Sequence, residues 1–86
     1  MLFHIEQSHS PEHCPYGSGG SRSLHDASVD GVDVKGVYGA FTEHVVFLLV
    51  EATDIDALHS FLVPGMKTCT TRIRPVSDHA MPTAGS

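Results

Sequence analysis

The chain has 86 residues, 41% of them hydrophobic and 17% charged, which is the balance of one globular domain with a single hydrophobic core. Its formal net charge is -5 with only five Lys and Arg residues, which excludes a surface built for nucleic acids or anionic membranes. No apolar run approaches the roughly 18 residues of a membrane-spanning helix, and the first residues lack the pattern of a secretory signal. We therefore expect a cytoplasmic protein whose two cysteines stay reduced.

The first predicted element is a strand at residues 2–8, LFHIEQS, in which the side chains alternate loosely in polarity. The segment HSPEHCPYGSGG follows at residues 9–20. It is rich in Pro, Gly and Ser, which are typical of turns, so we expect a loop without regular structure. This loop contains two histidines and one cysteine within six residues, and the chain as a whole has seven histidines.

A short helix is predicted at residues 21–30, because Ser23 and Asp26 have the spacing of a capping box and Gly31 suits a left-handed cap. Residues 32–41 then read as a second strand. Glycines within a strand suggest a bulge or a close approach by another group, and this segment contains two. Its aromatic residues are expected to be part of the core rather than the lining of a pocket.

The third predicted strand, residues 44–52, is apolar almost throughout, as is typical of a central strand covered on both faces. A second helix is expected to begin at Thr53, which has the capping-box spacing with Asp56, and to end at a Pro-Gly pair. Residues 67–76 alternate as the last strand. Residues 77–86 have little to bury and are expected to form a flexible tail.

The predicted order of elements is β-α-β-β-α-β over residues 1–76, which we take as one domain. This order is that of the ferredoxin-like α+β sandwich, with a four-stranded antiparallel sheet in the order 4-1-3-2. Two helices would cover one face of that sheet only. Since the third strand is apolar on both faces, we expect the other face to be buried in a homodimer or a higher oligomer.

Three segments resemble a family of small bacterial and archaeal proteins within the dimeric α/β-barrel superfamily. They are the opening MLFHIEQSHSPEHCP, the segment GVYGAFTEHVVFLLVEA, and the closing helix, Pro-Gly pair and Thr-rich strand. The similarity covers nearly all of residues 1–76, and the residues that match the family pattern are His4, the segment 11–15 and His44. It implies the fold and the dimer. It implies no particular activity, because the superfamily includes cofactor-free monooxygenases, haem-degrading enzymes, isomerases and ligand binders.

The predicted topology gathers metal-binding residue types at one rim of the sheet. Strand 1 would lie between strands 3 and 4 and run antiparallel to both, so its end would meet the beginnings of its neighbours. The residues brought to this rim are His9, His13, Cys14, His44 and Cys69. Imidazole and thiolate groups are the preferred ligands of zinc and copper, and of iron where carboxylates contribute.

We therefore predict a divalent transition-metal site formed by Cys14, His44, His9, His13 and His4, with Glu6 and Cys69 as candidates to support these ligands. The simpler alternative is a solvated loop with two buried thiols, because free cysteines often behave as small apolar groups. A Cys14–Cys69 disulfide is sterically conceivable, but a reducing compartment disfavours it. For Glu6, an ion pair with Arg72 or Arg74 on the neighbouring strand is preferred to an acid/base role beside His4.

Three functions follow from these alternatives. The first is a metal-dependent oxidoreductase or isomerase. The second is a cofactor-free enzyme of the monooxygenase or isomerase type, or a small-ligand binder, that uses a cavity between sheet and helices. The third is a structural or regulatory dimer without small-molecule chemistry.

Overall fold

The computed structural model describes residues 1–15, 20–79 and 81. Its strands and α-helix are β1 (Leu2–His9), β2 (Val32–Ala40), β3 (Val45–Ala52), α1 (Ile55–Leu62) and β4 (Cys69–Val76). Short 3-10 helices connect them, namely η1 (Pro11–His13), η2 (Gly20–Leu24), η3 (Phe41–Glu43) and η4 (Val63–Gly65). Within these residues no helix is long and apolar enough to span a membrane.

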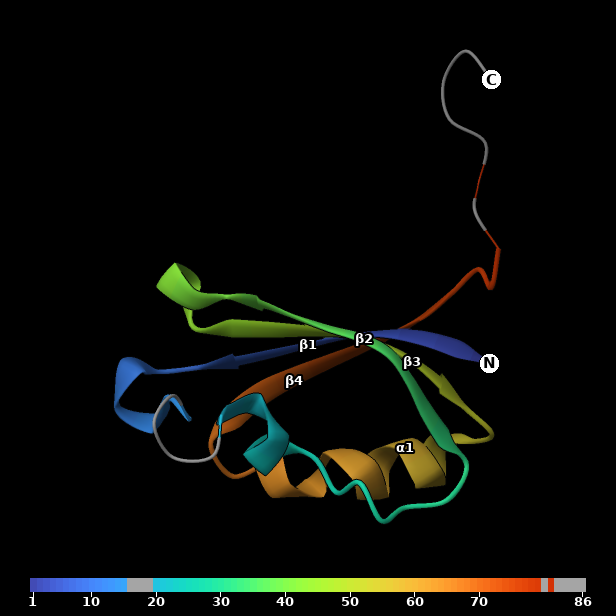
Figure 1. Ribbon diagram of the computed structural model, residues 1–86, viewed down its shortest axis with the longest axis horizontal. Helices are drawn as coiled ribbons and strands as arrows, with labels where there is room; N and C mark the ends of the chain where they lie inside the picture. Colours follow the sequence, from blue (N-terminus) through green and yellow to red (C-terminus); the bar gives the residue numbers. More distant parts are fainter. Residues whose placement is uncertain (16–19, 80, 82–86) are drawn as a thin grey trace.

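The strands form one sheet in the spatial order β2-β3-β1-β4, which reads 4-1-3-2 when counted from the β4 edge. All three neighbouring pairs are antiparallel. The helix α1 and the segment η2 lie beneath the same face of this sheet (Figure 1). The fold therefore belongs to the α+β class, with a four-stranded antiparallel sheet and, in the described part of the chain, one α-helix.

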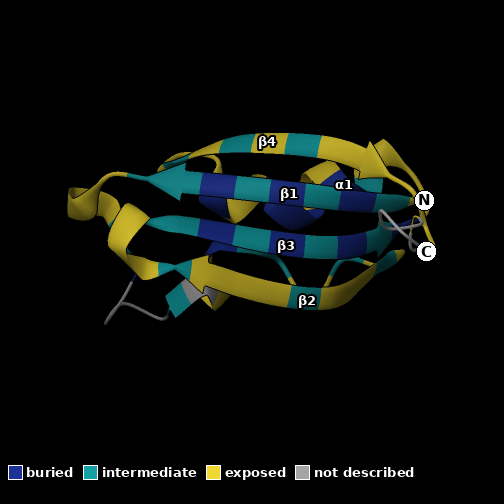
Figure 2. Ribbon diagram, turned by 90° about the horizontal axis from the view of Figure 1, so that it is seen from above, coloured by how far each residue is buried: buried dark blue, intermediate teal, exposed yellow. Residues whose placement is uncertain are grey.

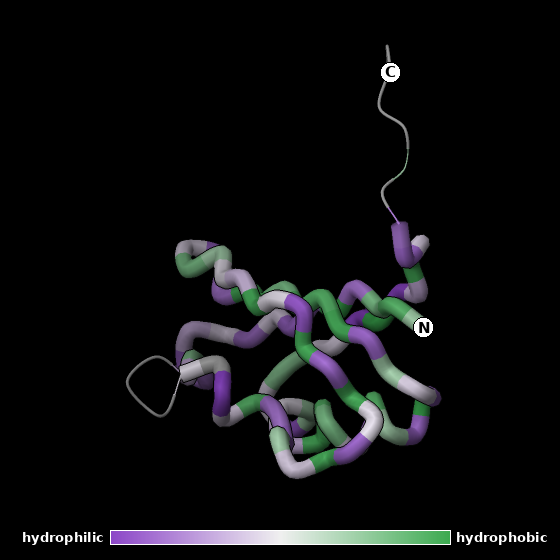
Figure 3. Tube along the Cα trace, turned by 45° about the vertical axis from the view of Figure 1, so that its right-hand side comes forward, coloured by the Kyte–Doolittle hydropathy of each residue, from purple (hydrophilic) through white to green (hydrophobic). Residues whose placement is uncertain are grey.

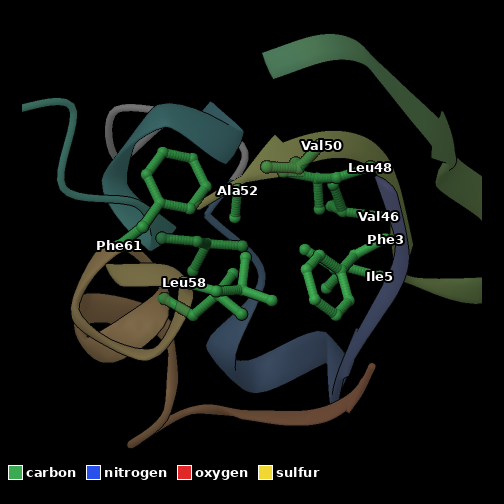
Figure 4. Close-up of a cluster of buried hydrophobic side chains, with 10 residues drawn as sticks. Phe3, Ile5, Val46, Leu48, Val50, Ala52, Leu58 and Phe61 are labelled. Carbon is green, nitrogen blue, oxygen red and sulfur yellow. The ribbon is translucent and has the colours of Figure 1, made fainter. Parts of the chain in front are cut away.

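The hydrophobic core lies between the sheet and α1. Alternate residues of β1 and β3 point toward the helix and are buried, while the residues between them are half-buried on the other face (Figure 2). Hydrophilic and hydrophobic residues alternate along much of the chain (Figure 3). The close-up in Figure 4 shows the side chains of the two layers meeting. The buried apolar residues are Phe3, Ile5, Leu24, Val46, Leu48, Val50, Ala52, Leu58, Phe61 and Leu62.

The predicted first helix at residues 21–30 is wrong. The chain forms only the 3-10 helix Gly20–Leu24 there, followed by turns. The carboxylate of Asp26 accepts hydrogen bonds from the backbone N–H and the hydroxyl of Ser28, at 3.0 and 2.6 Å. Such local side-chain bonds compete with the helical ladder. The ferredoxin-like pattern of two helices is therefore incomplete, and the segment contributes Leu24 to the core.

The predicted start of the second helix is displaced by one residue. Asp54, not Thr53, is the N-cap of α1, and its carboxylate accepts a hydrogen bond of 2.7 Å from the backbone N–H of Ala57. The backbone N–H of Thr53 instead donates to the carbonyl of Gly31 at 3.0 Å. Thr53 is thereby held against the start of β2, which leaves Asp54 as the first residue free to cap the helix.

The bulge that the glycines of the second strand suggested is confirmed. The register of β2 against β3 shifts between Val34 and Gly36, as expected of a bulge. Gly31, just before the strand, adopts a φ of 83°. The predicted tail at residues 77–86 lies partly outside the described residues, and β4 ends at Val76, where the predicted domain also ends.

The sheet face opposite α1 carries both polar and apolar side chains. β3 contributes Phe47 and Leu49 to this face, and both are only half-buried. No element of the described part of the chain covers them in a second layer (Figure 1). The described residues therefore leave untested the expectation that the central strand is covered on both faces, and the homodimer stays a prediction.

We expect light scattering to give about twice the chain mass of 9.2 kDa at micromolar concentration. Leu49→Lys should yield a monomer, because it places a charge among the apolar residues of this uncovered face. Thr70→Lys is the matched control, since Thr70 is exposed on the edge strand of the same face. A wild-type species of single-chain mass would contradict the prediction.

The stability of the fold should also depend on pH through His25. Its ring stacks on Phe61 at a centroid distance of 5.0 Å, and its Nε2 donates to the amide oxygen of the buried Gln7 at 2.7 Å. Burial lowers the pKa of His25 below the ordinary 6.5. As the pH falls through 6.5, the unfolded chain therefore takes up a proton first, and the free energy of unfolding decreases.

Urea unfolding at about pH 7.5 and about pH 5 measures this effect. We expect His25→Gln to reduce the loss of stability on acidification, because the variant has no proton to bind at this position. His59→Gln, on the exposed side of α1, should leave the loss unchanged. Equal losses in all three proteins would show that His25 does not contribute.

Candidate metal centre

Three residues from separate segments converge at the end of β1. His9 is the last residue of that strand, Cys14 follows η1, and His44 lies between η3 and β3. Their potential ligand atoms all lie within 4.8 Å of one another, and all three side chains are half-buried. The group could hold a metal ion. Antiparallel pairing creates it, since the end of β1 meets the turn that begins β3 (Figure 2).

His44 is fixed by the turn between β2 and β3. It caps η3 with a left-handed backbone of φ 55° and ψ 47°, and its N–H donates to the carbonyl of Phe41 at 3.4 Å. Its own carbonyl accepts from the N–H of His9 at 3.0 Å. A residue in this conformation closes a hairpin loop well, but a side chain there costs about 1 kcal/mol or more relative to glycine. His44 is the only non-glycine residue with positive φ in the described ranges.

Cys14 returns to the strand end through a compact turn. Pro11 begins η1. The N–H of His13 donates to the carbonyl of Ser10 at 3.0 Å, and the N–H of Cys14 donates to the carbonyl of Pro11 at 3.3 Å. Pro15, which follows, is buried. The turn is thus restricted by proline on both sides, which lowers the entropy lost in holding the thiol at one position.

The imidazole nitrogens in this group lack ordinary partners. Both ring nitrogens of His9 and the Nδ1 atom of His44 are buried and form no hydrogen bond with the described residues. Buried polar atoms of this kind are uncommon and each is unfavourable by roughly 1–3 kcal/mol. The two rings lie edge to face, with centroids 5.5 Å apart. A cation between them would take one nitrogen of each ring as a ligand.

The electrostatics also favour a ligand role for His9. Desolvation by burial lowers its pKa, and the neighbouring His44 lowers it further. The neutral imidazole, which is the form that binds metals, therefore predominates to lower pH than in a solvated histidine. Two imidazoles and one thiolate are suitable ligands for zinc.

The geometry is close to that of a metal site. Bonds of about 2.0–2.3 Å at tetrahedral angles place neighbouring ligand atoms roughly 3.3–3.6 Å apart. The observed limit of 4.8 Å therefore requires a contraction of about 1.2–1.5 Å at most. Rotation of the half-buried side chains can provide such a movement without a change in the sheet.

Two of the predicted ligands lie outside this group. His13 is exposed in η1, adjacent in sequence to Cys14. His4 lies on the opposite face of the sheet from His9, where its ring is 5.9 Å from that of Phe47. The alternation of side chains along β1 explains this position, because even-numbered and odd-numbered residues point to different faces.

The two predicted supporting residues also lie apart from each other. Glu6 is on the face of His4, where its carboxylate is 4.0 Å from the guanidinium of Arg72, which is the ion pair that the sequence favoured. Cys69 is the direct partner of His9 across the β1–β4 pair and packs against the core. Both cysteines are free thiols.

A cavity of about 210 Å³ adjoins the candidate metal centre. His9 and Cys14 belong to its wall, together with apolar residues of β2 and β3. Tyr38 and Phe41, which were expected to be core, line this cavity and are 65% and 80% exposed. The contributions of Pro15 and Val46 were not anticipated either. The sequence carries no periodic signal for them, because the wall depends on how the loop after η1 returns to the sheet.

Comparisons of the chain with protein-family models, with curated proteins and with solved structures found no match. The candidate centre therefore rests on its own geometry and chemistry.

The backbone of His44 provides a first test of the site. We expect His44→Gly to raise the free energy of unfolding of the metal-free protein by about 1 kcal/mol, because glycine adopts positive φ without strain. It also removes one buried, unpartnered ring nitrogen. His44→Ala, which keeps a Cβ, should lack most of this gain.

Chemical denaturation in the presence of a chelator measures both variants. A His44→Gly protein less stable than the wild type would show that the imidazole stabilises the metal-free fold, which contradicts this account of the residue.

Proposed function

We propose that the protein binds a divalent transition metal through His9, Cys14 and His44. The observation that carries this proposal is the convergence of three ligand atoms within 4.8 Å, together with buried imidazole nitrogens that have no partner in the described chain. Zinc fits two nitrogen ligands and one sulfur ligand best, and copper and iron are the alternatives. The thiol must stay reduced for this role, so we place the protein in the cytoplasm.

Three protein ligands leave one tetrahedral position open. Structural zinc sites are closed by four protein ligands, whereas catalytic sites keep a position for water or substrate. The donor set thus favours a metal-dependent enzyme of the oxidoreductase or isomerase type over a purely structural site. The cavity beside His9 and Cys14 supports the same reading, because it offers space for a substrate.

The cavity also favours a second candidate function, which is cofactor-free catalysis or binding of a small molecule. In that case the neutral imidazole of His9 would be the polar group of an otherwise apolar pocket. For either function we propose a homodimer of the ferredoxin-like, dimeric α/β-barrel type, supported by the strand pairing and by the apolar residues on the uncovered sheet face.

Metal analysis of the protein, purified without a histidine tag, tests the first proposal. We expect about one equivalent of metal per chain in the wild type. Cys14→Ser and His44→Ala should each lose most of it, because each removes one of three ligands. Cys69→Ser and His13→Ala are the matched controls, since they change the same residue types at neighbouring positions outside the group.

Added zinc at one hundred times its dissociation constant should stabilise the wild type by about 2.7 kcal/mol and the two ligand variants far less. It should also protect the Cys14 thiol from alkylation until a chelator is added. If Cys14→Ser and His44→Ala keep the full metal content, or if the controls lose as much, the proposed ligand set is wrong.

A further inference from the structure

We propose that the open position of this metal centre faces the adjoining cavity, and that the site takes a compact molecule with an uncharged, largely apolar body and one metal-binding donor atom at its end. This inference rests on the proposed metal site and adds to it the class of ligand. The connection between metal and cavity is direct, because His9 and Cys14 belong both to the ligand group and to the cavity wall.

The rest of the cavity wall is largely apolar. Val37 and Gly39 of β2 and Val46 of β3 lie on the side of the sheet that faces the helix layer, and the rings of Phe41 and Pro15 border the same space. None of the described residues that line the cavity is Asp, Glu, Lys or Arg. A charge on the part of the ligand that lies away from the metal would therefore lose its hydration without gaining an ion pair.

The volume of the cavity is enough for about one substituted ring. An enclosed apolar cavity of about 150 Å³ accommodates benzene, and the volume here is about 210 Å³. Gly39 helps to keep this space open, since a Cβ at this position would lie only 3.3 Å from Cε1 of Phe41. The donor atom is placed at one end of the molecule because only two residues of the cavity wall, His9 and Cys14, belong to the ligand group.

Cobalt(II) substitution gives a direct readout of the open position through the visible absorption of the metal. The probe is 4-phenylimidazole, which joins one nitrogen donor to one apolar ring, and imidazole and toluene represent its two halves. We expect 4-phenylimidazole to shift the cobalt bands at a concentration at least about tenfold lower than imidazole, because its phenyl ring is buried. Toluene alone should not shift them.

Val37→Phe should remove this preference by filling the cavity, while binding of imidazole persists. Val34→Phe is the matched control, because Val34 is on the same strand and the same side of the sheet. Its exposure is 40% compared with 42% for Val37, and it does not line the cavity. Phe41→Ala, at an exposed position where folding is not at risk, should weaken 4-phenylimidazole binding by removing one wall.

The inference is overturned if cobalt binds through the three ligands but 4-phenylimidazole and imidazole act at equal concentrations, or if Val34→Phe and Val37→Phe behave alike. That result leaves the metal site intact. If cobalt does not bind, or binds equally after Cys14→Ser, the metal site itself is refuted and the inference falls with it.

Discussion

The position of β1 between β3 and β4 is the constraint on which the rest of the structure depends. Antiparallel pairing on both sides fixes its register, with Ser8 opposite Val45 and His9 opposite Cys69. A shift of one residue would exchange the two faces of the strand and move Phe3 and Ile5 out of the core. The burial of those residues therefore also determines that the His9 ring is on the helix-facing side, next to the turn that contains His44.

The candidate centre lies where regular structure ends. Its residues follow a strand, a 3-10 turn and a hairpin loop, so rigid elements hold their backbones while the side chains keep some freedom to adjust. The buried nitrogens of His9 and His44 and the left-handed backbone of His44 are each unfavourable in the metal-free chain. Local costs of this kind often cluster at functional sites, which supports the proposed metal centre.

The sequence predicted most of the sheet and part of the site. All four strands were found because their polarity alternates or because they are continuously apolar, and pairing rules then brought His9 and His44 together. The helix at residues 21–30 failed because the local hydrogen bonds of Asp26 compete with the helical ladder, which a capping pattern does not reveal. His4 was placed in the metal group by its residue type, although its even position on β1 directs it to the other face. Cys14 was selected because a proline-restricted loop has few ways to return to the sheet, and the structure places its thiol within 4.8 Å of the two imidazoles.

The central claim is that one thiolate and two imidazoles share a metal ion. X-ray absorption spectroscopy of the zinc-loaded wild-type protein tests it most directly, because sulfur and imidazole neighbours give different distances and scattering patterns. The account predicts one sulfur at about 2.3 Å and two imidazole nitrogens at about 2.0–2.1 Å, with one lighter atom completing the shell. A shell without sulfur, or one with two sulfurs that would bring Cys69 into the site, would contradict it.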